Sequence, residues 1–238
     1  MTPHRIGLAA LAALATACSP IAVSAPTRTL PLETAETVRE GHVGIRAGGG
    51  IHTDGWGGEL GTGTGGVGIG VARDVELQAE GSFAWSDAVS QRGRSPFFAA
   101  GHVGVKHRVL DVLAFTGGIG FGAGPWGSFF GGDLGAILAY ENPYVIPFFA
   151  ARLQISTPLD ASTELVTDDN GVTTMLTPHT TLWLQPSTGL RFPICWQDEC
   201  GGTRVSLTLA VAWTAAIQVD AIHDGQGFGA EGGLLIEP

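Results

Sequence analysis

One glycine-rich stretch has the spacing of a dinucleotide-binding loop. Residues 61–66, GTGTGG, satisfy the pattern G-x-G-x-x-G. That pattern binds a pyrophosphate where it joins a strand to the start of a helix, because the helix then points its amides at the phosphates. Here residues 67–71, VGIGV, continue with a period of two. We therefore expect a strand through this stretch, with glycines that leave space for bulky side chains of neighbouring strands.

Several serine and histidine residues raise the question of a hydrolase. Ser156, Ser187 and His179 fall in one region of the predicted fold, while His52 and His223 each stand near an aspartate. Hydrolysis needs a nucleophile, a base and an orienting acid within hydrogen-bond reach. Nothing in the spacing brings such a set together. We expect solvated loop histidines, and neither enzymatic activity nor a metal or cofactor site.

Other charged residues fall on one face of predicted strands. If those strands close into a narrow barrel, this face lines the lumen and its side chains fill it. An isolated buried charge is very costly, so groups of opposite sign are expected to pair. A narrow polar conduit, or a proton-titratable gate that uses Glu76, Glu80 and His102, is the alternative. The predicted lumen network comprises Arg46, Glu76, Glu80, His102, Lys106, Asp133, Arg152 and Arg191.

The strands themselves are predicted from a period-two alternation that recurs from about residue 41 onward. In residues 75–86, VELQAEGSFAWS, one parity is mostly apolar and the other mostly polar. Only a strand separates residue classes in this way, and its length suits a tilted crossing of a bilayer. We predict ten strands, at residues 41–52, 58–72, 75–87, 96–109, 112–123, 129–141, 144–157, 179–192, 203–219 and 227–237.

The links between these strands alternate in length. Residues 73–74, 110–111 and 142–143 have the chemistry of tight turns, whereas the links between them are mostly longer or more polar. Short turns on one side and long loops on the other are typical of an up-and-down transmembrane barrel. With an even number of strands, both termini are expected on the short-turn, periplasmic side. The long loop 158–178 is a candidate for a small hairpin of its own.

Over residues 41–237 this pattern resembles small Gram-negative outer-membrane β-barrel proteins of the OmpA and OmpX barrel type. The resemblance implies an all-β, up-and-down antiparallel transmembrane barrel of about ten strands (8–10). Such barrels usually end in an aromatic residue that the assembly machinery recognises, whereas this chain ends LLIEP. Whether the last strand closes the barrel is therefore left open.

Composition excludes several other classes of protein. The 238-residue chain has a net charge of −10, so it could not neutralise nucleic-acid phosphates. With 44% apolar residues it is not disordered. It has no apolar run of the roughly 18 residues that a spanning helix needs.

The N-terminus has the layout of an export signal. A charged start precedes an apolar run at residues 6–17, and residues 14–18, LATAC, resemble a bacterial lipobox. We predict a lipoprotein-type signal peptide at 1–17, lipidation of Cys18, a flexible tether at 18–40 and a barrel domain at 41–238. Cleavage after Ala25 is the rival. The other two cysteines, Cys195 and Cys200, would form a disulfide in an oxidising periplasm, with two free thiols as the alternative.

These observations predict an integral protein of the outer membrane of a Gram-negative bacterium, with a narrow packed polar lumen and a structural or surface-interaction role. Its expected partners are outer-membrane lipid and the machineries that assemble barrels and sort lipoproteins. An external partner is not identified, and nucleic acid is not expected. One alternative is a lipid-tethered periplasmic barrel or sandwich that binds a small apolar ligand. A second is a barrel enzyme that acts on lipid or peptide.

Overall fold

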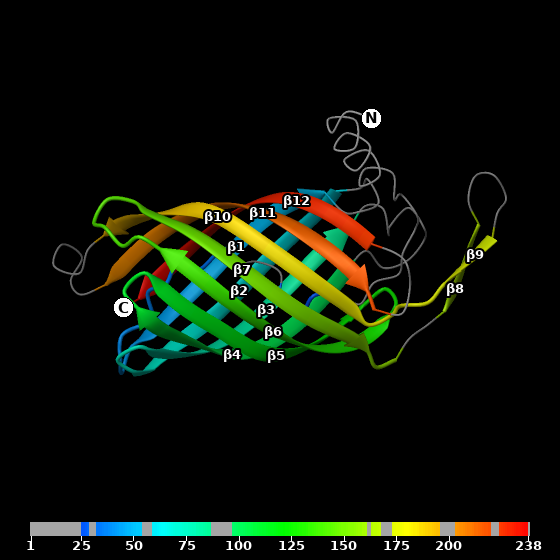
Figure 1. The fold of residues 1–238 in the computed structure, drawn as a ribbon, viewed down its shortest axis with the longest axis horizontal. Helices are drawn as coiled ribbons and strands as arrows, with labels where there is room; N and C mark the ends of the chain where they lie inside the picture. Colours follow the sequence, from blue (N-terminus) through cyan, green and yellow to red (C-terminus); the bar gives the residue numbers. More distant parts are fainter. Residues whose placement is uncertain are drawn as a thin grey trace, which may run out of the picture.

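A computed structural model describes residues 25–28, 32–53, 59–86, 97–160, 163–167, 173–195, 203–219 and 224–237. Ten of its strands form one closed barrel, and two more form a hairpin outside it (Figure 1). In the described part of the chain no helix is long and apolar enough to cross a membrane. The barrel strands are β1 (Val43–Thr53), β2 (Glu59–Ala72), β3 (Val75–Ser86), β4 (Phe97–Leu110), β5 (Leu113–Gly124), β6 (Gly127–Ala139), β7 (Ile146–Pro158), β10 (Thr181–Cys195), β11 (Arg204–Gln218) and β12 (Asp224–Glu237).

Every barrel strand pairs antiparallel with its neighbours, which confirms the up-and-down topology and the ten predicted strands to within three residues at each end. The last strand closes the ring: β12 pairs with β1 from Ile45 opposite Ile236 to His52 opposite Gly229. The question left open by the missing terminal aromatic residue is thereby answered. The hairpin in the loop 158–178 is also present, as β8 (Glu164–Thr167) and β9 (Thr173–Leu176).

The two ends of the barrel differ. At one end, here called the short-turn end, lie the links 73–74, 111–112, 140–145 and 196–203, together with the end of β12. At the other, the long-loop end, lie the links 54–58, 87–96, 125–126, 159–180 and 219–223. The β8–β9 hairpin projects from the long-loop end, on the right of Figure 1, and the C-terminal strand finishes on the left.

The wall has an apolar outer face and a largely polar inner face. In β3 the outward Leu77 is 45% exposed whereas its neighbour Glu76 is fully buried. The same alternation runs through the other strands, because successive side chains of a strand point to opposite faces. Outward apolar residues of the barrel include Ile45, Val67, Ile69, Val103, Phe115, Ile119, Leu134, Phe149, Leu153, Leu207 and Leu209.

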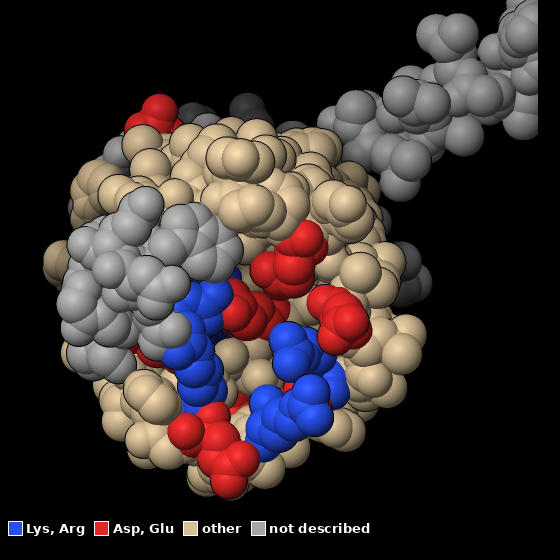
Figure 2. All heavy atoms as spheres, turned by 90° about the vertical axis from the view of Figure 1, so that its left-hand side faces the viewer, with Lys and Arg blue, Asp and Glu red and all other residues tan. Residues whose placement is uncertain are grey.

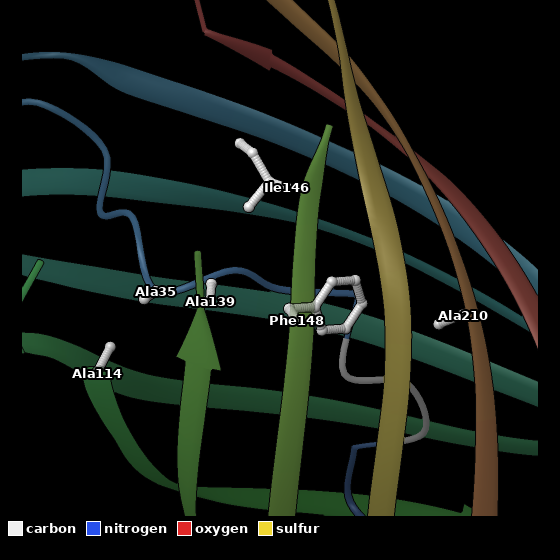
Figure 3. Close-up of a cluster of buried hydrophobic side chains, with 6 residues drawn as sticks. All are labelled: Ala35, Ala114, Ala139, Ile146, Phe148 and Ala210. Carbon is white, nitrogen blue, oxygen red and sulfur yellow. The ribbon is translucent and has the colours of Figure 1, made fainter. Parts of the chain in front are cut away.

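The interior is occupied by the chain's own N-terminal part. Residues 25–28 and 32–40, called the lumenal segment below, lie inside the barrel and are mostly buried. Ala25 is near the long-loop end and Glu40, which forms a parallel bridge with Gly70, is at the short-turn end. The prediction of a tether outside the fold is therefore wrong for these residues. The two ends of the barrel itself agree with the prediction, because β1 begins and β12 finishes at the short-turn end, whereas the first described residue, Ala25, lies near the long-loop end. Part of this segment packs on inward apolar side chains: Figure 3 shows Ala35 among Ala114, Ala139, Ile146, Phe148 and Ala210.

Candidate functional site

The centre of the lumen holds a group of ion pairs between the lumenal segment and β1–β3. The guanidinium of Arg28 contacts the carboxylates of Glu33 and Glu80. Arg46 contacts Glu76, and it lies 3.2 Å from Glu33 and 3.7 Å from Glu80. Charges contributed by the segment and by the wall thus alternate in sign. This arrangement is what makes a buried charge tolerable, because each charge has a partner of opposite sign.

A second group lies on β4, β6 and β7. His102 Nε2 is 2.5 Å from Asp133 Oδ1, and Arg152 Nε is 3.6 Å from Asp133 Oδ2. Beside them Gln154 holds the segment's backbone: its amide nitrogen donates to the Arg28 carbonyl at 2.8 Å, and its amide oxygen accepts from the Arg28 N–H at 3.3 Å. The wall therefore binds both the side chain and the backbone of Arg28.

The short-turn end is ringed by charges of both signs, as Figure 2 shows. Arg204 lies 2.5 Å from Glu36 of the segment and 3.4 Å from Glu237 of β12. Arg191 donates to the hydroxyl of Thr34 at 2.6 Å. Since Glu36 and Thr34 belong to the segment, these contacts attach it to β10 and β11.

Lys106 and Glu76 also bind the segment near the short-turn end. Lys106 is 3.3 Å from Glu76 and donates to the Thr34 carbonyl at 3.4 Å. The same Glu76 accepts from the backbone N–H of Val38 at 2.9 Å. Glu76 therefore joins β1, β4 and the segment at a single buried carboxylate.

Outside the spanning strands, Glu141 in the link 140–145 has a raised pKa. Burial is the main cause, and the nearby Glu36 carboxylate adds to it, while Arg191, Arg204 and Lys106 oppose it. In the described structure its Oε1 atom is buried without a hydrogen-bond partner. The ionised form of Glu141 is therefore disfavoured in the folded protein.

The long-loop end is closed over the segment by aromatic residues. Trp126 and Phe129 are buried, Phe98 lies 6.1 Å from Trp126 between ring centroids, and all three line a small pocket with Ala25. The Ala25 carbonyl accepts a hydrogen bond from Ser156 at 2.8 Å. These residues, called the aromatic collar below, surround the point at which the described part of the segment begins.

Glycines of the wall make room for the segment. A Cβ on Gly70 would collide with the Arg39 carbonyl, and one on Gly48 or Gly233 would collide with Leu32. A Cβ on Gly120 would lie 2.6 Å from Thr27. The expected role of such glycines, space for bulky side chains, therefore extends to a whole chain segment. The stretch 61–66 itself lies within β2, as expected, and not in a nucleotide-binding loop.

All eight residues of the predicted lumen network lie inside the barrel. One group, on β1–β4, is Arg46, Glu76, Glu80 and Lys106, and a second, on β4, β6 and β7, is His102, Asp133 and Arg152. Arg191 lies apart from both, nearer the short-turn end. Glu80 and His102 are cross-strand neighbours, yet their side chains contact Arg28 and Asp133 respectively. They form no continuous titratable row.

Sequence reasoning missed the partners of this network. Arg28, Glu33 and Glu36 of the lumenal segment were placed in a tether, and His52, expected in solvent, is buried 3.1 Å from Glu231. One signal was present: several inward positions are glycine, so the wall side chains alone leave space in the lumen.

The predicted lipidation site, disulfide and serine–histidine set are the remaining candidates. Cys18 and Cys200 lie outside the described residues, so lipidation and the disulfide with Cys195 stay predictions. Ser156 is fully buried and bonded to Ala25. It faces Thr181 across the ladder, whereas Ser187 faces Ala150, six positions further along the wall, so the two serines do not share one site with His179.

A closed antiparallel barrel with an apolar outer band and a polar interior is an integral outer-membrane β-barrel, because closure leaves no unpaired strand edge in the lipid. The protein belongs to this class, and its location is the outer membrane of a Gram-negative bacterium.

Comparisons with known proteins gave similarities to solved structures alone. Neither the protein-family models nor the curated proteins contain a match. Among solved structures the chain is similar to the β domain of the Bordetella autotransporter BrkA (14% identity, TM-score 0.44, 82% of this chain and 98% of that one). It is also similar to the N-terminal barrel of Pseudomonas aeruginosa OprF (14%, 0.34, 84% and 98%) and to the translocator domain of NalP from Neisseria meningitidis (13%, 0.41, 82% and 87%). Identities this low carry no information about function.

Proposed function

We propose that this protein is a non-conducting outer-membrane barrel with a structural or surface-interaction role. The observation that supports this most is the lumenal segment, which fills the interior and pairs its charges with those of the wall. Arg28 alone contacts Glu33, Glu80 and Gln154. A solute on its way through would have to separate these buried pairs, which is strongly unfavourable.

Within the described residues, the cavity beside the segment near the short-turn end is small. A cavity of about 40 Å³ lies between residues such as Leu32, Arg46 and Gly233. That volume accommodates a few water molecules and no larger solute. It also argues against the apolar-ligand alternative, since this cavity is lined in large part by charged side chains and the large apolar residues of the wall face outward.

The surface available for interaction lies at the long-loop end. There the β8–β9 hairpin pairs only with itself in the described structure, and Met175 is 67% exposed. Long loops that a rigid barrel holds away from the membrane are suited to contact with other molecules.

Conductance measurements test the closed interior. We expect the purified, heat-modifiable barrel to give no steady current in planar bilayers. As a control for detection, a variant in which residues 25–40 are replaced by a Gly-Ser chain of equal length should conduct, because that chain lacks the side chains that fill the lumen and pair with its wall. A steady ohmic current from the unaltered protein would refute the proposal.

The surface role requires a separate test. Replacement of residues 163–177 by a short Gly-Ser turn should leave barrel assembly intact and reproduce the phenotype of a strain that lacks the protein. If the strain behaves as wild type, the hairpin is not the interacting surface.

A further inference from the structure

We infer that the start of the mature chain lies at the cell surface and reaches β1 through the barrel. The first step is the direction of the lumenal segment. Ala25 bonds to Ser156 near the long-loop end, Arg28 contacts Glu80 midway, and Arg39 donates from its backbone to Glu237 at the short-turn end. The segment therefore enters at the long-loop end and leaves at the short-turn end.

The second step is the orientation of the barrel. In outer-membrane barrels the short turns face the periplasm and the long loops face outward. The links 73–74 and 111–112 are two residues each, whereas the loop that contains β8 and β9 extends from 159 to 180. Hence the aromatic collar opens to the outside, and any mature residue that precedes Ala25 is on the outer side.

The third step concerns where the mature chain starts. Ala25 is buried, its carbonyl is hydrogen-bonded, and it lines the pocket of the aromatic collar. Cleavage after Ala25 would remove this packing and the hydrogen bond to Ser156, and would leave the N-terminal amine on the half-buried Pro26 beside the buried Thr27 and Arg28. A cut further upstream keeps these contacts, and the fold therefore favours it.

A start at Cys18 would have enough chain to reach the membrane. The seven residues from there to Ala25 span at most about 25 Å when extended. A ten-stranded barrel has a radius of roughly 10 Å, from a strand spacing of about 4.8 Å and the usual tilt. A lipid on Cys18 would therefore be anchored in the outer leaflet, whereas the sequence predicts both termini on the periplasmic side.

Epitope accessibility tests this arrangement. One tag is inserted between Ile21 and Ala22, a second in the outer link 87–96 as a positive control, and a third in the link 196–203 as a negative control. Each variant is checked for heat modifiability and for the mass of the mature chain. We expect antibody to bind the first two tags on intact cells, and the third only after the outer membrane is permeabilised.

Two results would overturn the inference: a first tag that becomes accessible only after permeabilisation while the 87–96 tag is accessible on intact cells, or a mature mass that begins at Pro26. If the inserted tag prevents assembly, a Ser24→Cys variant in a Cys195→Ser, Cys200→Ser background takes its place. Its labelling by a membrane-impermeant maleimide on intact cells supports the inference, and failure to label contradicts it. Neither readout depends on conductance, so the inference and the proposed function can fail separately.

Discussion

The two faces of the barrel wall meet different demands although they alternate residue by residue. Leu77 on the outer face contacts the surroundings, and any apolar side chain would serve there. Glu76, one position earlier, contacts Arg46, Lys106 and the backbone of Val38. The outer face therefore depends on residue class, whereas the inner face depends on residue identity. Four substitutions test this difference, from the largest expected effect to the smallest.

Loss of the Glu76 carboxylate should have the largest effect. Glu76→Ala leaves Arg46 and Lys106 without a shared buried partner, and removal of one member of a buried pair costs about 3–5 kcal/mol. Urea unfolding in detergent or lipid measures the change in the free energy of unfolding. Leu77→Ala is the matched control on the outer face and should cost less. Equal losses in the two variants would show that the faces do not differ.

A charge on the outer face should have the next largest effect. Leu134 in the middle of β6 is 71% exposed to the surroundings of the barrel. Leu134→Arg should destabilise the folded barrel by about 2–4 kcal/mol in lipid, the range for a cation near the bilayer midplane. Leu134→Phe, which keeps the residue class, should unfold close to wild type. A tolerated arginine in lipid vesicles would mean that this position does not face acyl chains.

A methyl group against the lumenal segment should have a moderate effect. In Gly70→Ala the new Cβ meets the Arg39 carbonyl, a backbone atom that cannot rotate away, and overpacking typically costs about 1–3 kcal/mol. Gly81→Ala is the control, because its Cβ would have open space. The temperature at which each protein loses its folded gel mobility compares them, and identical temperatures would contradict the close approach.

Glu141, half-buried in the link 140–145 at the short-turn end, should give the smallest effect, and that effect should depend on pH. Its pKa is raised in the folded state, so its favourable contribution is present at acidic pH and is lost as the pH rises through that pKa. Glu141→Gln cannot ionise, and we expect it to be more stable than wild type at neutral pH but not near pH 4. Urea midpoints across this range measure the difference, and a constant offset would argue against the shift.

The contrast between the faces also explains what could be predicted from sequence. Alternation around Glu76 and Leu77 is strong because lipid and lumen select opposite classes, so strands and inward charges were predictable. The lumenal segment has no such pattern, because its described residues make few ladder bonds and contact side chains from many strands at once. The type of Phe98, Trp126 and Phe129 fits a membrane interface as well as a packed mouth, so the sequence does not distinguish the two. Only the closed structure shows that they point inward.

The glycine-rich seam between β1 and β12, with Gly48 and Gly233 against Leu32, encloses a strand of chain that continues into β1 itself. The segment passes through the barrel and is covalently continuous with one of the strands that form its wall. It can be withdrawn only by drawing its free end back through the bore or by unzipping that seam. If the free end were anchored outside the barrel, only separation of β1 from β12 could release the segment. The stability of that one strand pair would then determine how long the lumen stays closed.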